Sequence, residues 1–143
     1  MGGRHADRLD RLFEALESLD LSAVAELCAD DCIYEDVPYP EATVVGPAAI
    51  RAKLALGFAG LERLETRTHE LVEDQDTVLV ERTEVWHHAT GERATLRVAS
   101  VFKFRGAKLT LWRDYWDAKT LLDQQPPAWL PQIPRLVPTR SMP

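Results

Sequence analysis

The sequence predicts an α+β domain in which helices come first and a curved antiparallel sheet follows. Before residue 61, apolar residues recur at steps of three and four, which is the period of an amphipathic helix. From residue 61 onward the pattern changes to alternation, in segments rich in Val, Leu, Thr and aromatic residues. The 143 residues, of which 45% are hydrophobic, suffice for one core of ordinary size. We therefore expect a single domain over residues 1–124 and a proline-rich tail over residues 125–143.

Three helices and a short strand are expected in the first part of the chain. Residues 5–19 carry an apolar stripe with charged residues between its members, which are Leu9, Leu12, Phe13, Leu16 and Leu19. A second, shorter helix over residues 21–29 follows Asp20, which is a suitable N-cap. Residues 32–38 are typical of a short strand that ends at a proline. The third helix covers residues 47–58 and has a proline in its first turn, where the missing N–H costs nothing.

Four long strands are expected in the second part of the chain. Alternating segments separated by turn-forming residues cover residues 61–74, 76–88, 94–104 and 108–117. Such a succession predicts an antiparallel meander, with one helical turn after it at residues 118–123. A strongly curved meander forms a cup, and helices that cover a cup enclose an apolar ligand pocket.

Composition narrows the class of partner. The formal charge of −6 and the pI near 5.2 argue against nucleic acid and anionic membranes, because both require clustered Lys and Arg; an apolar small molecule fits better. The opening residues are charged and helix-periodic rather than a signal peptide, and no stretch is long enough to cross a bilayer, so we expect a cytoplasmic protein. Cys28 and Cys32 lack the further ligands of a metal site, so we expect reduced structural cysteines and no metal.

Strand alternation gathers charged and apolar side chains on one side of the expected sheet. In one strand, Arg82 and Glu84 point to the same side as a tryptophan. In the last strand, Asp114 shares its side with two more tryptophans. The apolar residues expected on these same sides include Trp86, Leu96, Val98, Trp112 and Trp116. If these sides face inward, the cup contains one cation between two carboxylates.

Such a trio has a specific chemistry. Two carboxylates in a site of low dielectric cannot both ionise cheaply, so one holds its proton while the guanidinium keeps the other charged. A protonated acid beside an ionised base is what push–pull opening of a strained ring requires. The same spacing also fits a ladder of ion pairs on a solvated face, and spacing alone does not decide between the two.

Five segments of the sequence have the order and approximate spacing of a known family. They are IYEDVPYP (33–40), VERTEV (80–85), ATGER (89–93), VASVFKF (98–104) and LTLWRDYWD (109–117). Over roughly residues 5–122, the chain resembles limonene-1,2-epoxide hydrolase-like proteins of the SnoaL-like or NTF2-like superfamily. The resemblance implies an NTF2-like cone, in which a curved antiparallel sheet covered by N-terminal helices surrounds an apolar pocket. It also implies a homodimer through the convex sheet face and a reaction without cofactors.

The resemblance assigns a role to each polar residue of the trio. It implies that Asp114 is the general base that activates water and that Tyr34 positions this water. Arg82 would bridge the carboxylates, and Glu84 would take the place of the general acid. The wall around a hydrophobic epoxide would comprise Phe13, Leu16, Trp86, Leu96, Val98, Trp112 and Trp116.

Two positions depart from the family's pattern. The family's acid is Asp, whereas Glu84 is longer by one methylene, about 1.5 Å of extra reach. Asp36 stands where the family has Asn, so a third carboxylate replaces a neutral amide. Either change can alter the reaction, because proton transfer depends closely on distance and charge.

Asp36 also supports a second hypothesis. Ketosteroid isomerases of the same superfamily have an Asp at this place that moves a proton next to a carbonyl. The isomerase's oxyanion donors are missing here, because Leu12 and Ser100 stand about where its Tyr and its protonated Asp are. We therefore rank epoxide opening by water or an internal hydroxyl first. A SnoaL-like polyketide cyclase or ketosteroid-isomerase-like enzyme with Asp36 as base comes second, and a non-catalytic binding module third.

Two further segments concern how the domain is covered. Leu109, Leu111 and Tyr115 make one side of the last strand apolar for an exposed sheet, so a homodimer across that side is expected. The tail contains too many prolines for a helix or a central strand. It is expected either to be disordered or to lie over the body through Trp129, Leu130, Ile133 and Leu136.

Overall fold

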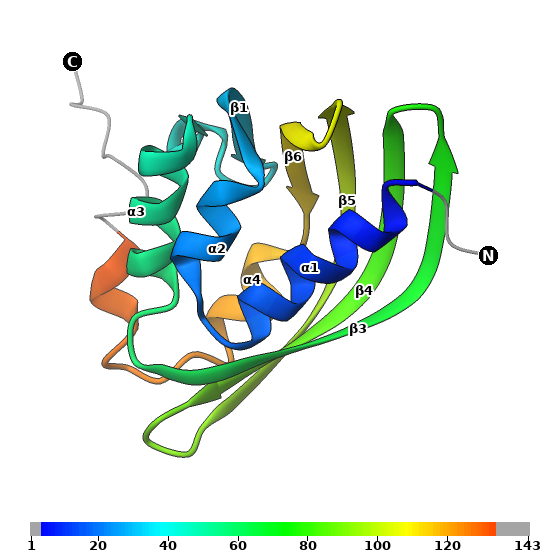
Figure 1. Cartoon of the computed structure of the whole chain (residues 1–143). Coiled ribbons are helices and arrows are strands. Elements are labelled where there is room, and N and C mark those ends of the chain that lie inside the picture. The colour runs from blue at the N-terminus through cyan, green and yellow to red at the C-terminus, as the bar shows by residue number, and fades with distance from the viewer. Residues whose placement is uncertain (1–3, 134–143) are drawn as a thin grey trace.

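The computed structural model describes residues 4–133 of the chain (Figure 1). The helices are α1 (Ala6–Glu17), α2 (Leu21–Glu26), α3 (Pro47–Gly57) and α4 (Ala118–Leu122). The strands are β1 (Cys28–Asp36), β2 (Val44–Val45), β3 (Leu61–Asp74), β4 (Thr77–His88), β5 (Arg93–Arg105) and β6 (Lys108–Tyr115). Two short 3₁₀ turns, Pro40–Ala42 and Leu130–Gln132, complete the described elements. The α+β class expected from the sequence is confirmed.

The strands form one six-stranded sheet in the order β2-β1-β6-β5-β4-β3. Strands β3 to β6 pair antiparallel in sequence order, which confirms the expected meander. Strand β1 pairs parallel with β6, so the expectation of an antiparallel sheet is wrong at this one pair. Parallel neighbours require a long crossover connection, and here α3 and the meander itself provide it. The sheet is therefore mixed.

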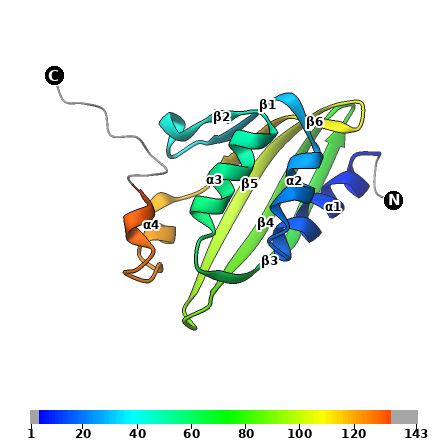
Figure 2. The same cartoon turned by 60° about the vertical axis from the view of Figure 1, so that its left-hand side comes forward.

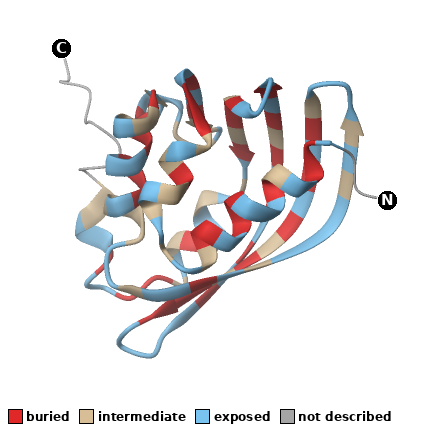
Figure 3. Cartoon of the chain, in the orientation of Figure 1, coloured by how far each residue is buried: buried red, intermediate tan, exposed pale blue. Residues whose placement is uncertain are grey.

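The sheet is strongly curved, and three helices lie against its concave side (Figures 1 and 2). Buried and exposed residues alternate along β4 and β5, as Figure 3 shows, because successive side chains of a strand point to opposite faces. Helix α1 contributes its apolar stripe to the core. The largest buried side chains include Leu9, Leu12, Leu16, Ile50, Leu64, Phe102 and Trp112.

The ends of the helices follow local side-chain chemistry. The carboxylate of Asp20 accepts a hydrogen bond from the backbone N–H of Ala23, which confirms the predicted N-cap of α2. Helix α2 ends at Glu26, earlier than the expected residue 29, because Cys28 already belongs to β1. Helix α3 begins after Gly46, whose φ of 93° is accessible mainly to glycine.

The outer face of β6 differs from the expectation. Leu109 is buried at 1% exposure and belongs to the core, because the register of β5 and β6 shifts between Lys103 and Phe104. Tyr115 is exposed, and so is Leu79 on the same outer face of the sheet. The homodimer across this face stays a prediction.

The first part of the proline-rich tail lies over the open end of the sheet. Trp129 is buried, and its indole N–H donates to the carbonyl of Gly57 at 2.8 Å. The buried side chains of His88 and Gln125 are joined by a hydrogen bond of 2.6 Å. Leu136 lies outside the described residues, and the boundary after residue 124 stays a prediction. Within residues 4–133, no helix combines the length and apolarity needed to span a membrane.

Gly46 offers a test of how α3 is fixed to β1. A Cβ at this position would lie 3.0 Å from the backbone oxygen of Asp30, whereas a Cβ at Gly91, which also has positive φ, would meet nothing within 4 Å. We expect Gly46→Ala to lower the free energy of unfolding by more than the matched control Gly91→Ala, whose cost is about 1–2 kcal/mol for the backbone alone. Urea denaturation measures both, and equal losses would contradict the close approach.

Candidate active site

A cavity lies between the concave face of the sheet, α3 and the segment after β6. Its aromatic lining residues are Tyr34, Tyr39, Phe58, Trp86, Trp112, Trp116 and Trp129. Its smaller apolar lining residues are Leu16, Ala42, Leu54, Gly57, Leu96, Val98, Leu121, Leu122 and Ile133. Four acidic or basic side chains complete the lining, namely Asp36, Lys53, Glu84 and Asp114. The cavity is thus an apolar box with a small number of charged groups, as expected of a small-molecule site.

Arg82 connects two of these acids from behind the cavity wall. It is fully buried and does not line the cavity itself. Its Nη2 lies 3.0 Å from Oε2 of Glu84, and its Nη1 donates to the hydroxyl of Ser100 at 2.5 Å. Nη2 also lies 3.6 Å from Oδ1 of Asp114. Burial alone would lower the pKa of Arg82, but the two carboxylates raise it above its usual value, so the guanidinium stays charged.

Asp114 is held on one oxygen and has the other available. Its Oδ1 accepts hydrogen bonds from the hydroxyl of Ser100 at 2.5 Å and from the indole N–H of Trp112 at 2.9 Å. Within residues 4–133, Oδ2 receives no hydrogen bond. Because β5 and β6 pair Ser100 directly with Asp114, the sheet register fixes this contact.

The environment of Asp114 makes it titrate close to neutral pH. Burial raises the pKa of this carboxyl to about 6. The charge of Arg82 and the hydrogen bond from Ser100 lower the pKa, whereas the charges of Asp36 and Glu84 raise it. A carboxylate in this range is suited to general-base catalysis, because it is ionised at neutral pH and still a useful proton acceptor.

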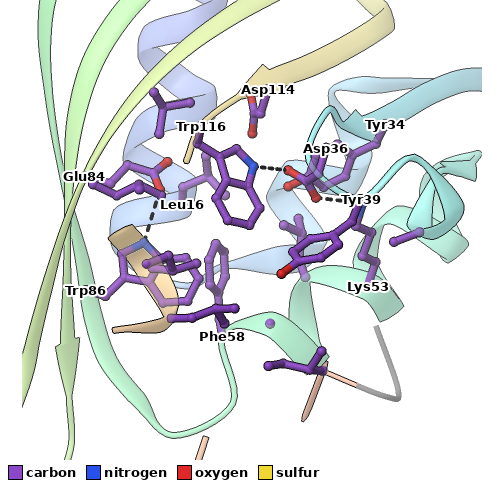
Figure 4. Close-up of a pocket in the computed structure, with 18 of the residues that line it drawn as sticks. Leu16, Tyr34, Asp36, Tyr39, Lys53, Phe58, Glu84, Trp86, Asp114 and Trp116 are labelled. Carbon is purple, nitrogen blue, oxygen red and sulfur yellow. Dashed lines mark hydrogen bonds and ion pairs between the residues drawn. The ribbon is translucent and has the colours of Figure 1, made fainter. Parts of the chain in front are cut away.

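Glu84 is satisfied on both carboxyl oxygens. Oε2 faces Arg82, and Oε1 accepts a hydrogen bond from the indole N–H of Trp86 at 3.2 Å (Figure 4). Glu84 is 7% exposed and lines the cavity. The solvated ion-pair ladder left open by the sequence is therefore wrong, because Arg82, Glu84 and Asp114 meet on the concave side.

Tyr34 lies beside this group, on β1. Its ring stacks on Trp112 with centroids 4.2 Å apart and planes 9° from parallel. Burial, together with the nearby charges of Asp36, Asp114 and Glu84, raises its pKa well above the usual value. The hydroxyl therefore stays neutral and can donate a hydrogen bond.

Asp36 lies on the same wall and has a partner that the sequence did not reveal. Lys53 on α3 places its Nζ 2.8 Å from Oδ2 of Asp36, and Trp116 donates its indole N–H to Oδ1 at 2.9 Å (Figure 4). Lys53 is 9% exposed. Its position was a recognisable signal, since it shares the buried side of α3 with Ile50 and Leu54.

Most of the expected site residues meet in this cavity. Those that line it are Leu16, Tyr34, Asp36, Glu84, Trp86, Leu96, Val98, Trp112, Asp114 and Trp116. Phe13 does not line it, because its ring packs against Phe102 and beneath the guanidinium of Arg82, 5.2 Å away. Sequence reasoning did not identify the roles of Ser100 and Lys53.

The fold and the site define the class of protein: a cone-shaped α+β domain built around a covered apolar pocket with buried acids. The chain belongs to the SnoaL-like family, since the profile of the SnoaL-like domain matches residues 9–112. The resemblance seen in the sequence is thereby confirmed.

Individual relatives point in the same direction. Epoxide hydrolase EphG of Mycobacterium tuberculosis is 29% identical over 110 residues, which are 76% of this chain and 70% of that protein. An LEH-like epoxide hydrolase of M. tuberculosis superposes with a TM-score of 0.69 at 26% identity, over 93% of this chain and 95% of the other. A Shewanella putrefaciens protein described as a SnoaL-like polyketide cyclase reaches a TM-score of 0.76 over 87% and 97% of the two chains. Its 14% identity shows the fold alone.

The raised pKa of Asp114 predicts how stability depends on pH. The folded state favours the protonated carboxyl, so the contribution of Asp114 to stability is present below about pH 4 and is lost as the pH rises through about 6. We therefore expect Asp114→Asn to stabilise the fold at pH 8 by about 1–3 kcal/mol and to have little effect at pH 4.

Thermal unfolding across this pH range measures the effect. Asp31→Asn is the control, because Asp31 is exposed and pairs with Arg105, which lowers its pKa. This variant should gain no stability at pH 8. A gain for Asp114→Asn that is equal at pH 4 and pH 8 would contradict the burial of an ionised Asp114.

Proposed function

We propose that the protein opens an epoxide of an apolar small molecule in one acid–base step, with Asp114 as the base and water as the nucleophile. The observation that carries this proposal is the buried chain Arg82–Ser100–Asp114, which leaves Oδ2 of Asp114, at an apolar cavity, without a hydrogen-bond partner among residues 4–133. The similarity to EphG and to the LEH-like epoxide hydrolase supports it.

The proposed reaction needs two protein groups and no cofactor. Asp114 takes a proton from water as the water oxygen bonds to one epoxide carbon. The bond from that carbon to the epoxide oxygen breaks, and the oxygen takes a proton from Glu84 in its carboxylic acid form. Water and epoxide give a diol, and the proton gained by Asp114 later returns to Glu84. Tyr34 donates its hydroxyl hydrogen bond to orient the attacking water.

Arg82 makes this division of roles possible. Its guanidinium lies between Glu84 and Asp114, so it can stabilise the ionised form of one acid while the other serves as the proton donor. The apolar lining strengthens these electrostatic interactions, because it excludes competing water. It also favours substrates without charge, such as terpene-like or aryl epoxides.

A cyclase-type enzyme with Asp36 as the base is the second candidate. The likeness to SnoaL-like folds and the position of Asp36 on the cavity wall support it. Asp36 is the weaker base candidate, because its Oδ1 accepts a hydrogen bond from Trp116 and its Oδ2 forms an ion pair with Lys53. A non-catalytic binding module is the third candidate.

Labelled water tests the reaction directly. Incubation of the protein with limonene 1,2-epoxide or styrene oxide in H₂¹⁸O should give a diol with one ¹⁸O, detected by mass spectrometry. We expect Asp114→Asn to lower the rate by about 10²–10⁴-fold, which is the usual contribution of a general base. Asp31→Asn, on the exposed surface, is the matched control and should keep the wild-type rate.

The outcomes separate the three candidates. Full activity in Asp114→Asn would contradict the proposal. Loss of activity in Asp36→Asn, with Asp114→Asn fully active, would favour the cyclase-type enzyme. Tight binding of an apolar ligand, without turnover in any variant, would favour the binding module.

The pH dependence of kcat/KM provides a second test. Because the base must be ionised, we expect kcat/KM to rise with pH through an acid limb with its midpoint near pH 6, and to fall again at a pH where the general acid loses its proton. A rate that is already maximal at pH 4.5 would mean that an acid with an ordinary pKa, rather than Asp114, is the base.

A further inference from the structure

Two carboxylates stand side by side on neighbouring parallel strands. Asp36 of β1 is the register partner of Asp114 of β6, and both line the cavity. Each accepts an indole N–H on Oδ1, from Trp116 for Asp36 and from Trp112 for Asp114, both at 2.9 Å. Like charges this close cannot both be present without cost, so their titrations are linked.

Each of the two acids has its own cation. Asp114 faces Arg82 at 3.6 Å, whereas Asp36 faces Lys53 at 2.8 Å. The Lys53 side chain is 8% exposed, and its Nζ also lies over the ring of Tyr34, 4.2 Å from the centroid. A buried ammonium is costly unless it is paired, so the contact with Asp36 has to be maintained for Lys53 to stay buried.

The ion pair of Lys53 with Asp36 is closer than that of Arg82 with Asp114. Lys53 contacts Asp36 without an intermediary, whereas the short contacts between Arg82 and Asp114 pass through Ser100. Oδ2 of Asp36 is therefore occupied, and Oδ2 of Asp114 is the oxygen without a partner within residues 4–133. A proton entering the carboxylate pair finds its acceptor on Asp114.

We infer that Lys53 is a positioning residue that pairs with the Asp36 carboxylate and holds it toward α3, so that the oxygen left free to accept a proton in the carboxylate pair belongs to Asp114. Its role in catalysis rests on the proposed function, but the division of charge within the pair does not. Where the resemblance leads one to expect a neutral Asn, this chain has the acid Asp36 on β1, and Lys53 on α3 supplies the cation that pairs with it.

The surrounding charges determine the sign of the effect. Asp114 is faced by Arg82 and Glu84 from β4 and by Asp36 from β1. Lys53 is the cation that α3 contributes. With all groups ionised, three carboxylates stand against two cations. Removing Lys53 leaves three carboxylates against one cation, so the Asp36–Asp114 pair must take up its proton at a higher pH. Removing Asp36 removes one negative charge, so Asp114 must take up its proton at a lower pH.

Indole NMR signals report each acid separately and require no substrate. In ¹H–¹⁵N spectra the indole of Trp112 follows Asp114, and the indole of Trp116 follows Asp36. Trp129 donates to a backbone carbonyl and supplies an internal control that should not titrate with either acid. Tryptophan-to-phenylalanine variants assign the signals.

We expect the Trp112 signal of the wild type to titrate near neutral pH while the Trp116 signal stays unchanged from pH 5 to 8. In Lys53→Met both signals should titrate, with a midpoint about one pH unit higher than that of Trp112 in the wild type. Asp36→Asn should shift the Trp112 midpoint downward, and Lys53→Arg should keep the wild-type pattern. A Trp116 signal that stays unchanged in Lys53→Met would overturn the inference.

A double variant protects the test against loss of folding. Asp36→Asn combined with Lys53→Met removes both members of the ion pair, so neither is left behind as an unpaired buried charge and the fold tolerates the loss of Lys53. If Lys53 acts mainly through Asp36, Lys53→Met should raise the Trp112 midpoint clearly less in the Asp36→Asn background than in the wild-type background. An equally large shift in both backgrounds would contradict this route.

Kinetics distinguish failure of the inference from failure of the proposed function. If the enzyme opens epoxides, the acid limb of kcat/KM in Lys53→Met should move upward together with the NMR midpoint. NMR shifts as expected in a protein without epoxide turnover would uphold the inference and reject the proposed function. Epoxide turnover together with unchanged NMR midpoints in Lys53→Met would uphold the proposed function and reject the inference.

Discussion

The fully buried guanidinium of Arg82 is the constraint on which the rest of the structure depends. A cation with no exposed surface is stable only where acids and other acceptors surround it, and here Glu84 and Ser100 contact it while Asp114 lies 3.6 Å away. These acceptors come from three successive strands, so they converge only if the meander has its observed register and curvature. Helix α1 closes the site from behind through Phe13. The requirement to satisfy one cation thus links core packing, sheet register and the ionisation of the pocket acids.

The carboxylates that line the pocket are satisfied in a similar way, by hydrogen bonds from neighbouring side chains. Each of the three lining carboxylates accepts the indole N–H of a tryptophan: Glu84 from Trp86, Asp114 from Trp112 and Asp36 from Trp116. Tryptophan presents an apolar ring to the cavity and a polar N–H to its wall, so the box stays apolar while no acid lacks a partner. This pairing explains why charged and aromatic residues are interleaved in the last strand. It also explains how an apolar pocket holds the groups that acid–base chemistry needs.

Period and turn chemistry predicted the helices, the meander and which side chains of a strand share a side, whereas they left open which side faces inward. Alternation placed Arg82 and Glu84 on one side of their strand and Asp114 on the side of its own strand that carries Trp112 and Trp116, because the side-chain period of a strand is exact wherever the ladder is regular. It failed at Leu109, where a register shift reverses the alternation, and at the parallel pairing of β1 with β6. Lys53 and Ser100 were missed for another reason: their partners lie on different elements, and such contacts become visible only once the elements are packed.

The central claim is that burial in an apolar pocket, beside Arg82 and two further carboxylates, turns Asp114 into a base that titrates near neutral pH. The ¹³C NMR titration of its side-chain carboxyl tests this most directly, with selectively labelled aspartate and the signal assigned by its loss in a variant at that position. The account predicts a midpoint near pH 6. A midpoint at or below about 4, the value of an ordinary aspartate, would contradict it.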